Sequence, residues 1–530
     1  MAVAYQPLGS RVSSWVPKRF VPLNKLIIIC GILFTFILVL LPFVNETAHD
    51  SVIDGASSVS SLVQWGSATP WTGKNASDGA LRSYGKKDNF RENLRPDMNY
   101  IMSGFHSGWT NDVMMGANLI HLGLLTNRTP ILFPFPPARH LRYIDDAAHI
   151  PPSLPFETVF DLPRLSHTIG IPLVRISELK ARVPGKLLVG QEEDTIQPVE
   201  EEIGGWSIWM VTNPEWHKPK TSDQEEEQNK EIEDGRRCYQ LDTYKIKPYF
   251  TPVPVTFRPV IDWTSVHFAA LASLFKPLPN PFTQFYLTQV PSYFTERHRE
   301  QPKLAPDDHV LYIDFLYNLG EAEGDSRYDW TGRGKLGKVG AWETVGKYMR
   351  WEPEIEEMTK GYLRRAFGVK DKKGARIPPF ISVHIRRSDI GDICKDLSSE
   401  ELAGTTDKNC YAPIQKYADR VAEVQKLLLE EKGIKTAHVL ATTDEHDESF
   451  LKEVRDLGWI MLNHDKELTI EKNGLWYPTL IDSIALSLGT GFVGTSGSTM
   501  SILARRRVEE WNGGIGRQVL RKYGGLDDEN

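Results

Sequence analysis

Short apolar segments and longer segments with helical spacing alternate along residues 380–511 of this 530-residue chain. The short segments are rich in Ile, Val and Leu, which favour strands. The predicted strands are residues 380–385, 438–442, 459–462 and 491–494, and the predicted helices are residues 413–431, 448–457, 478–488 and 499–511. This order predicts an α/β domain whose parallel sheet has helices on both faces. Ligands of such sheets bind beyond the carboxyl ends of the strands.

A second region of the same kind begins near residue 96. A predicted strand at 100–102, a glycine-bearing turn at 103–112, a helix at 113–125 and a strand at 130–133 follow one another. A helical segment at 341–367, interrupted by Pro353, closes this region. The chain is long enough for two domains with extra segments. We place the N-terminal domain at 96–375, with an irregular acidic surface insertion at about 191–237, and the C-terminal domain at 376–530.

The segment 26–44, LIIICGILFTFILVLLPFV, is uncharged and long enough to span a membrane as a helix. Basic residues precede it and acidic residues follow it, which predicts a cytosolic tail at 1–25 and a lumenal body. A cleaved signal peptide is the alternative, but the apolar run is longer than is usual for one. Residues 45–95 are rich in Ser, Gly, Asp and Thr and predict a flexible stem. We therefore expect a single-pass type II protein of the Golgi or ER membrane.

Three sequons fit a lumenal body, with acceptor residues Asn45, Asn75 and Asn127. Asn127 could instead simply end the predicted helix before it. Cys394 and Cys410 bracket one polar loop and would form a disulfide in an oxidising compartment, with two free thiols as the alternative. The four cysteines of the chain fit no zinc pattern, and no Asp-x-Asp metal motif is convincing. The net charge of −7 argues against a nucleic-acid partner.

The predicted strand at 380–385 leads directly into Arg386 and Arg387. A guanidinium group at a strand's carboxyl end suits a phosphate ligand because its donors match phosphate oxygens. Arg386 follows His384 by two positions and so shares its side of the strand, which favours a functional role. For Arg387 we expect a structural ion pair with Asp389.

A hydroxyl-rich turn, residues 494–499, leads into the last predicted helix. The amide groups at that helix start would face an anion, although Ser498 as a plain N-cap explains the turn equally well. Two anion sites at neighbouring strand ends favour a diphosphate. A diphosphate ligand and a lumenal body indicate a nucleotide-sugar transferase, in which arginine and the helix dipole replace a metal in stabilising the leaving group.

The sequence HIRRSD at 384–389 resembles the H-x-R-x-x-D signature of the GDP-fucose protein O-fucosyltransferase and α1,6-fucosyltransferase superfamily. Asp482 and the turn containing Ser498 resemble the last motif of that superfamily. Asn111 resembles part of its N-terminal motif, but Asp112 replaces the usual glutamine, and Ser388 stands where glycine is common. The resemblance covers about residues 97–510 outside the acidic insertion, and the C-terminal half most resembles fungal members.

This resemblance implies a GT-B-like fold, in which two Rossmann-like domains face a cleft, and inverting transfer of fucose from GDP-fucose without a metal or other cofactor. It implies that Arg386 is catalytic, holding the β-phosphate as GDP leaves. The other implied donor-binding residues are Asn111, His384, Asp482, Ser496, Ser498 and Thr499. His106 and Asp112 are the nearby candidates for the general base.

Two alternatives stay open from the sequence. The first is a glycosyltransferase that uses another nucleotide sugar, because the sugar pocket cannot be read. The second is a non-catalytic, membrane-anchored binding protein on the same fold. The acceptor, a protein or a glycan, is not specified by any motif.

Overall fold

The computed structural model describes residues 73–83, 87–105, 107–137, 141, 152–186, 188–192, 197–208, 239–252, 266–267, 307–320, 340–387 and 411–520. Several sequence predictions lie outside these ranges: the tail and anchor at 1–44, the first part of the stem, Asn45, His106, Ser388, Asp389 and the disulfide between Cys394 and Cys410. Within the described ranges, no helix combines the length and hydropathy that a membrane span requires.

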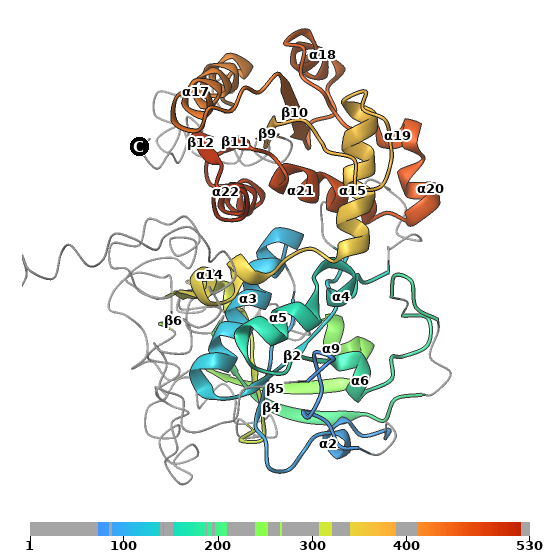
Figure 1. Ribbon diagram of the computed structural model, residues 1–530. Coiled ribbons are helices and arrows are strands. Elements are labelled where there is room, and N and C mark those ends of the chain that lie inside the picture. The colour runs from blue at the N-terminus through green and yellow to red at the C-terminus, as the bar shows by residue number, and fades with distance from the viewer. Residues whose placement is uncertain are drawn as a thin grey trace, which may run out of the picture. The chain divides into compact units, whose positions relative to one another are not determined.

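The N-terminal sheet consists, in the described part of the chain, of six parallel strands (Figure 1). In spatial order they are β3 (Val174–Arg175), β2 (Thr129–Leu132), β1 (Tyr100–Met102), β7 (Val310–Ile313), β4 (Glu201–Ser207) and β5 (Ile246–Pro252). The helices of this region are α2 (Phe90–Asn93), α3 (Trp109–Thr126), α4 (Phe156–Val159), α5 (Leu162–Ile169), α6 (Ile176–Leu179) and α9 (Tyr239–Thr243). A separate parallel pair joins β6 (Val266–His267) to β8 (Leu319–Gly320), which follows the 3-10 helix η5 (Leu316–Asn318).

The strand β1 lies in the middle of this sheet and is fully buried. Its partners are β2 on one side and β7 on the other, so Tyr100 lies opposite both Thr129 and Val310. The helix α3, which follows β1, starts at Trp109 and therefore includes residues 109–112, which the sequence assigned to a turn. Gly108 is the N-cap and Asn127 ends the helix in the left-handed conformation. The sequence thus predicted the β1–α3–β2 unit correctly but placed the start of its helix four residues late.

The predicted stem at 45–95 is wrong in its last part. Ala80, Phe90 and Leu94 are fully buried within the N-terminal core. The Tyr100 hydroxyl donates to the Ala80 carbonyl at 2.6 Å, and this bond ties the segment to β1. The segment is rich in polar residues, but its few apolar side chains fill the core next to the sheet. The folded body therefore begins well before residue 96.

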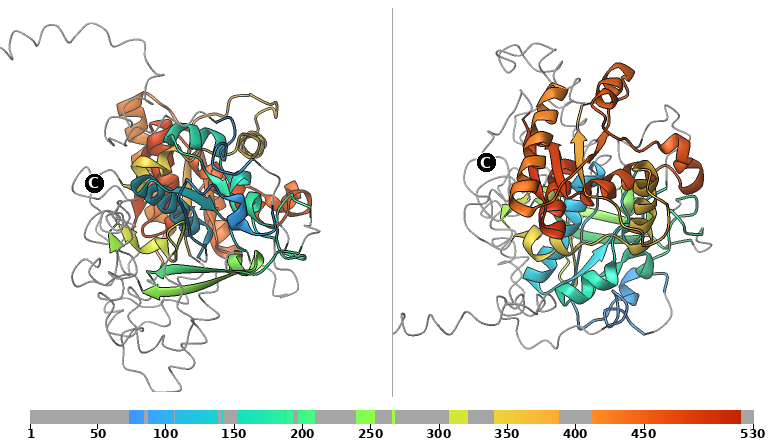
Figure 2. Two further views of the ribbon diagram at one scale, coloured as in Figure 1. Left: turned by 90° about the horizontal axis from the view of Figure 1, so that it is seen from below. Right: turned by 45° about the horizontal axis from the view of Figure 1, so that its top comes forward.

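The predicted acidic insertion at 191–237 also needs correction. Residues Glu201–Ser207 form β4, which pairs with β5 over its full length and with β7 at its carboxyl end. The two long strands β4 and β5 run side by side (Figure 2). Glu201 is only 7 % exposed because its carboxylate pairs with Lys180, which is fully buried. The acidic run predicted that Glu201 would be exposed to solvent. Its burial is possible because Lys180, which is distant in the sequence, neutralises its charge.

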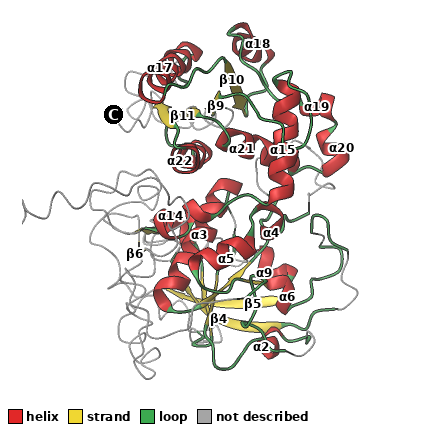
Figure 3. Cartoon of the chain, viewed as in Figure 1, coloured by secondary structure: helices red, strands yellow, loops and turns green. Residues whose placement is uncertain are grey.

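The C-terminal sheet is parallel throughout, with the order β10 (His438–Thr443), β9 (Phe380–Ile385), β11 (Gly491–Thr495) and β12 (Ile515–Val519). Its helices are α17 (Ile414–Lys432), α18 (Glu448–Asp456), α19 (His464–Glu467), α20 (Thr469–Asn473), α21 (Tyr477–Ser487) and α22 (Thr499–Asn512). Between the sheets lie α14 (Ala341–Thr344), the 3-10 helix η6 (Gly346–Tyr348) and α15 (Pro353–Ala366) in chain order. The predicted alternation of strands and helices is confirmed (Figure 3).

Two details of the C-terminal sheet differ from the sequence prediction. The predicted strand at 459–462 pairs with β10 only at Ile460, as an isolated bridge to Leu440. The last strand, β12, was not predicted, although its Ile515 and Val519 are buried next to β11. Both cases depend on pairing with a distant strand, which a short apolar pattern does not reveal.

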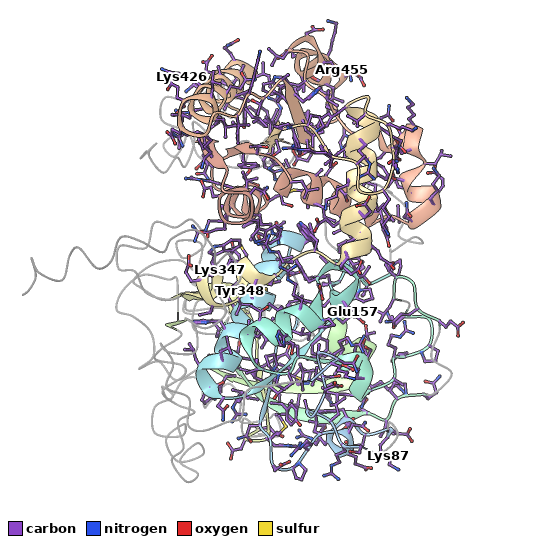
Figure 4. All side chains as sticks on the ribbon, viewed as in Figure 1. Lys87, Glu157, Lys347, Tyr348, Lys426 and Arg455 are labelled. Atoms are coloured by element: carbon purple, nitrogen blue, oxygen red, sulfur yellow. The ribbon has the colours of Figure 1, made fainter. Side chains whose placement is uncertain are left out.

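Side chains along β9 alternate between two environments. Ile381, Val383 and Ile385 pack in the core cluster that α17 shares. Ser382 donates to a carbonyl of α21 at 2.7 Å, and His384 contacts α22. α17 and α18 lie on one side of the sheet and α21 and α22 on the other (Figure 1), and the exposed Lys426 and Arg455 project outward from α17 and α18 (Figure 4). The strand thus directs His384 toward α22.

Candidate functional site

Thr495, the last residue of β11, joins the carboxyl ends of β9 and β11. Its hydroxyl accepts a hydrogen bond from the Arg386 amide at 2.9 Å and lies 3.2 Å from the His384 carbonyl, to which it donates. The hydroxyl of Tyr417, from α17, approaches the same oxygen at 2.7 Å. Thr495 is only 1 % exposed, so these bonds are shielded from water. The backbone at Arg386 is therefore held against the end of the neighbouring strand.

His384 is buried beside Arg386 and is neutral in the folded protein. Its side chain is 4 % exposed, and its Nδ1 atom lies 2.8 Å from the Ser501 hydroxyl of α22. Burial, with a smaller contribution from the charge of Arg386, lowers the pKa of His384 to about 3. A neutral imidazole has one N–H donor and one acceptor nitrogen, so it recognises a ligand by hydrogen bonding and not by charge.

The low pKa of His384 predicts a specific loss of stability in acid. Between about pH 3 and 6.5 the unfolded chain takes up a proton at this residue and the folded chain does not. The stability that neutral His384 provides is therefore fully present above pH 6.5. Below that pH the free energy of unfolding falls by about 1 kcal/mol per pH unit. In His384→Gln we expect a flatter decline, measured by urea unfolding at a series of pH values.

His464 provides the matched control for this measurement. Burial opposes its charge, but the hydrogen bond and charge of Asp482 outweigh that effect and raise its pKa. Its stabilising effect is therefore present below its unfolded pKa and lost as the pH rises through the folded value. His464→Gln should change the pH dependence at neutral to alkaline pH, on the opposite side from His384→Gln. The same slope for wild type and His384→Gln below pH 6 would contradict a buried neutral His384.

The two arginines after β9 have different surroundings. Arg386 forms an ion pair with Asp444, which follows β10, and both side chains are about one fifth exposed. The Nε atom of Arg387 lies 2.9 Å from a carboxylate oxygen of Glu445. Its guanidinium carbon stacks 3.9 Å from the centre of the Phe450 ring. The predicted structural role of Arg387 fits its contacts with Glu445 and Phe450. Its predicted pairing with Asp389 lies outside the described residues and stays a prediction.

Asp444 was missed by sequence reasoning. Its carboxylate pairs with Arg386 and also accepts a hydrogen bond from the Arg387 amide at 2.7 Å. It lies just beyond the carboxyl end of β10, the neighbour of β9. The rule that parallel strands end at one edge could have indicated it, because Asp444 follows a predicted strand just as Arg386 does.

The start of α22 lies close to these arginines along the strand ends. Ser498 is the N-cap residue, but its side chain makes no capping hydrogen bond, so the plain N-cap interpretation is not supported. Gly497 before it has φ +75°, which glycine adopts without strain. Ser496 is 6 % exposed, and its amide donates to β12 at 2.9 Å. Ser498 therefore does not cap the first amide groups of α22, and within the described part of the chain these amides could face an anion.

The starts of α3 and α22 meet through two hydroxyl groups, Thr110 and Thr499, whose oxygen atoms are 2.7 Å apart. This contact brings Asn111, the next residue of α3, to the same region as the end of β11. Asp112 is fully buried and accepts a hydrogen bond from the Ser107 amide at 2.9 Å. That contact ties Asp112, in the first turn of α3, to the segment before the helix, and its role as a general base stays a prediction.

Asp482 has different neighbours from the residues above. It lies on α21, where its carboxylate is 3.1 Å from Nε2 of His464. The Nδ1 atom of His464 is 3.1 Å from the hydroxyl of Thr469. Described hydrogen bonds through Ser501 and Thr495 connect His384 to Arg386, and Thr499 contacts Thr110. The described side-chain hydrogen bond of Asp482 instead leads to His464 of α19. Its donor-binding role also stays a prediction.

Two of the predicted glycosylation residues are described. Asn75 is exposed, and its side-chain amide donates to Asp78 at 3.1 Å. Asn127 is also exposed and ends α3 with φ 54°, so the alternative that it terminates the helix is confirmed. Their modification stays a prediction. Among the described residues, no three His, Cys, Asp or Glu side chains gather as they would around a metal ion.

Residues 126–510 match the family model described as GDP-fucose protein O-fucosyltransferase. The chain belongs to this family. It is thus a glycosyltransferase of the GDP-fucose protein O-fucosyltransferase family, and the resemblance drawn from residues 384–389 is confirmed. No curated protein matches the sequence at a significant level.

The solved structures to which the chain is similar include those of POFUT1 and NodZ. POFUT1 in complex with GDP-fucose is 15 % identical, with 82 % of this chain and 99 % of that chain covered and a TM-score of 0.42. The fucosyltransferase NodZ from Bradyrhizobium is 12 % identical, with 77 % and 92 % covered and a TM-score of 0.31.

Proposed function

We propose that this O-fucosyltransferase family member transfers L-fucose from GDP-fucose, with inversion, to a hydroxyl group of a protein or glycan. The observation that carries the proposal is the joining of Arg386, His384 and the uncapped start of α22 at the carboxyl ends of β9 and β11. These are positive or hydrogen-bond-donating groups at the edge where ligands of parallel sheets bind. Membership of the family supports GDP-fucose as the ligand.

In the proposed reaction an acceptor hydroxyl attacks the anomeric carbon of fucose while its bond to the β-phosphate breaks. Negative charge grows on the departing GDP, and the acceptor proton passes to a general base. Arg386 and the first amides of α22 stabilise that charge because they are already oriented before the reaction begins. Since Arg386 pairs with Asp444 in the described structure, the diphosphate must share or replace this partner. His384 donates a hydrogen bond without adding charge.

We further propose that the two parallel sheets correspond to the two domains of a GT-B fold and that the body is lumenal. The uncharged segment at 26–44 and the charges that flank it support a type II anchor in the Golgi or ER membrane. Resistance of the body to added protease in sealed microsomes tests this topology, and digestion without detergent would refute it.

Binding of nucleotide sugars by the full-length protein in detergent tests the donor. We expect GDP and GDP-fucose to raise the melting temperature in proportion to the logarithm of their concentration, and UDP-sugars to leave it unchanged. Release of GDP in the presence of candidate acceptors then separates an enzyme from a binding protein. A shift with GDP-mannose equal to that with GDP-fucose would favour another donor sugar, and no shift with any GDP compound would refute the proposal.

A further inference from the structure

The Ser501 hydroxyl lies between a backbone amide and the imidazole of His384. Ser501 is the third residue of α22 and is fully buried. Its Oγ atom accepts a hydrogen bond from the Thr495 amide at 3.0 Å and lies 2.8 Å from Nδ1 of His384. Among the described residues these are the two hydrogen bonds of the Ser501 side chain.

The single hydroxyl proton of Ser501 decides the direction of its hydrogen bond with Nδ1 of His384. A serine hydroxyl has one proton to donate and two lone pairs to accept with. The Thr495 amide already uses one lone pair. If Nδ1 of His384 also donated, the proton of Ser501 would be buried without an acceptor, and an unsatisfied buried donor is unfavourable. The arrangement in which Ser501 donates to Nδ1 satisfies all three groups, and it leaves the ring proton of His384 on Nε2.

We infer that Ser501 is a positioning residue that fixes His384 in the tautomer with hydrogen on Nε2, so that Nε2 donates to an acceptor oxygen of the bound GDP-sugar. The identity of the ligand rests on the proposed function, but the tautomer itself does not. The ring stays neutral at working pH because of its burial, so exactly one of its nitrogen atoms can donate. Without Ser501 nothing in the described surroundings would hold that proton on Nε2.

Nitrogen NMR of protein labelled with ¹⁵N-histidine tests the inference directly. Comparison with His384→Gln identifies the signals of His384 among those of the other histidines. We expect Nδ1 without hydrogen and Nε2 with hydrogen in the wild-type protein, unchanged between about pH 5 and 8. In Ser501→Ala we expect the ring to populate both tautomers. Hydrogen on Nδ1 in the wild type, or the same single tautomer in Ser501→Ala, would overturn the inference.

Ser382→Ala is the matched control. Ser382 is also fully buried and lies on β9, two residues before His384, but its hydroxyl donates to the carbonyl of Leu486 at 2.7 Å and not to the ring. Both variants lose one buried hydroxyl, so both should lower stability. Only Ser501→Ala should change the tautomer and weaken GDP-fucose binding, by about tenfold. Equal weakening in both variants would mean that Ser501 acts only through stability.

The measurements separate failure of the inference from failure of the proposed function. The wild-type tautomer is observed without any nucleotide and without any substitution, so it can be read even if Ser501→Ala does not fold. If the wild-type protein has the expected tautomer but binds no GDP compound, the proposed function fails and the role of Ser501 in fixing the ring stands.

Discussion

Replacement of Arg386 with alanine is expected to lower the rate of fucose transfer roughly 10²–10³-fold, because a preoriented positive group is lost where negative charge grows on GDP. The Arg386 amide is held by Thr495 and its side chain pairs with Asp444, so its charge is fixed in place before donor binding. Arg386→Lys should restore little activity, since an ammonium group cannot reproduce the forked contact with phosphate. GDP release under saturating donor measures the effect.

Arg387→Ala is the matched control for this prediction. Arg387 stacks on Phe450 and pairs with Glu445, so its loss should lower the melting temperature more and the rate less than the loss of Arg386. Both variants are compared with wild type in the same assay and in thermal unfolding. Wild-type turnover in Arg386→Ala would refute the catalytic role of Arg386. An equal loss of rate in the two variants would show that Arg386 contributes no more to the rate than Arg387.

Replacement of Lys180 with methionine should lower the free energy of unfolding by about 3–5 kcal/mol. The side chains of Lys180 and Glu201 are 0 % and 6 % exposed, and Glu201 also accepts a hydrogen bond from the Phe90 amide at 2.9 Å. Removing the lysine leaves a buried carboxylate without its cation, which is the costly change. The double variant Lys180→Met/Glu201→Leu removes both charges and should recover much of the loss. Urea unfolding measures all three proteins.

An exposed ion pair in the same chain supplies the control. Lys452 and Asp456 are one helical turn apart on α18 and are 69 % and 62 % exposed. Lys452→Met should change stability by less than about 0.5 kcal/mol, because water screens such pairs. Similar small effects at Lys180 and Lys452 would show that the Lys180–Glu201 pair is not buried in solution. A double variant no more stable than Lys180→Met would show that the lysine contributes mainly through packing.

The sequence by itself determined the elements whose apolar residues repeat locally. The strands β9, β10 and β11 and the helices α17, α18, α21 and α22 were predicted within a residue or two of their observed ends. The order of these elements also predicted the parallel sheet and the edge at which Arg386 lies. The motif at 384–389 indicated the family, because that information lies in adjacent residues.

The tertiary structure decided what depends on residues far apart in the chain. Glu201 is buried because Lys180 reaches it, so β4 joins the sheet although its sequence is acidic. Ala80, Phe90 and Leu94 pack in the core next to the sheet although the sequence around them is polar. Arg386 pairs with Asp444, which follows β10, and His384 contacts Ser501 of α22. Both partners are distant in the sequence. Local patterns record which residues favour a strand or helix, but contacts between distant segments arise only when the folded chain brings their charges and hydrogen-bonding groups together.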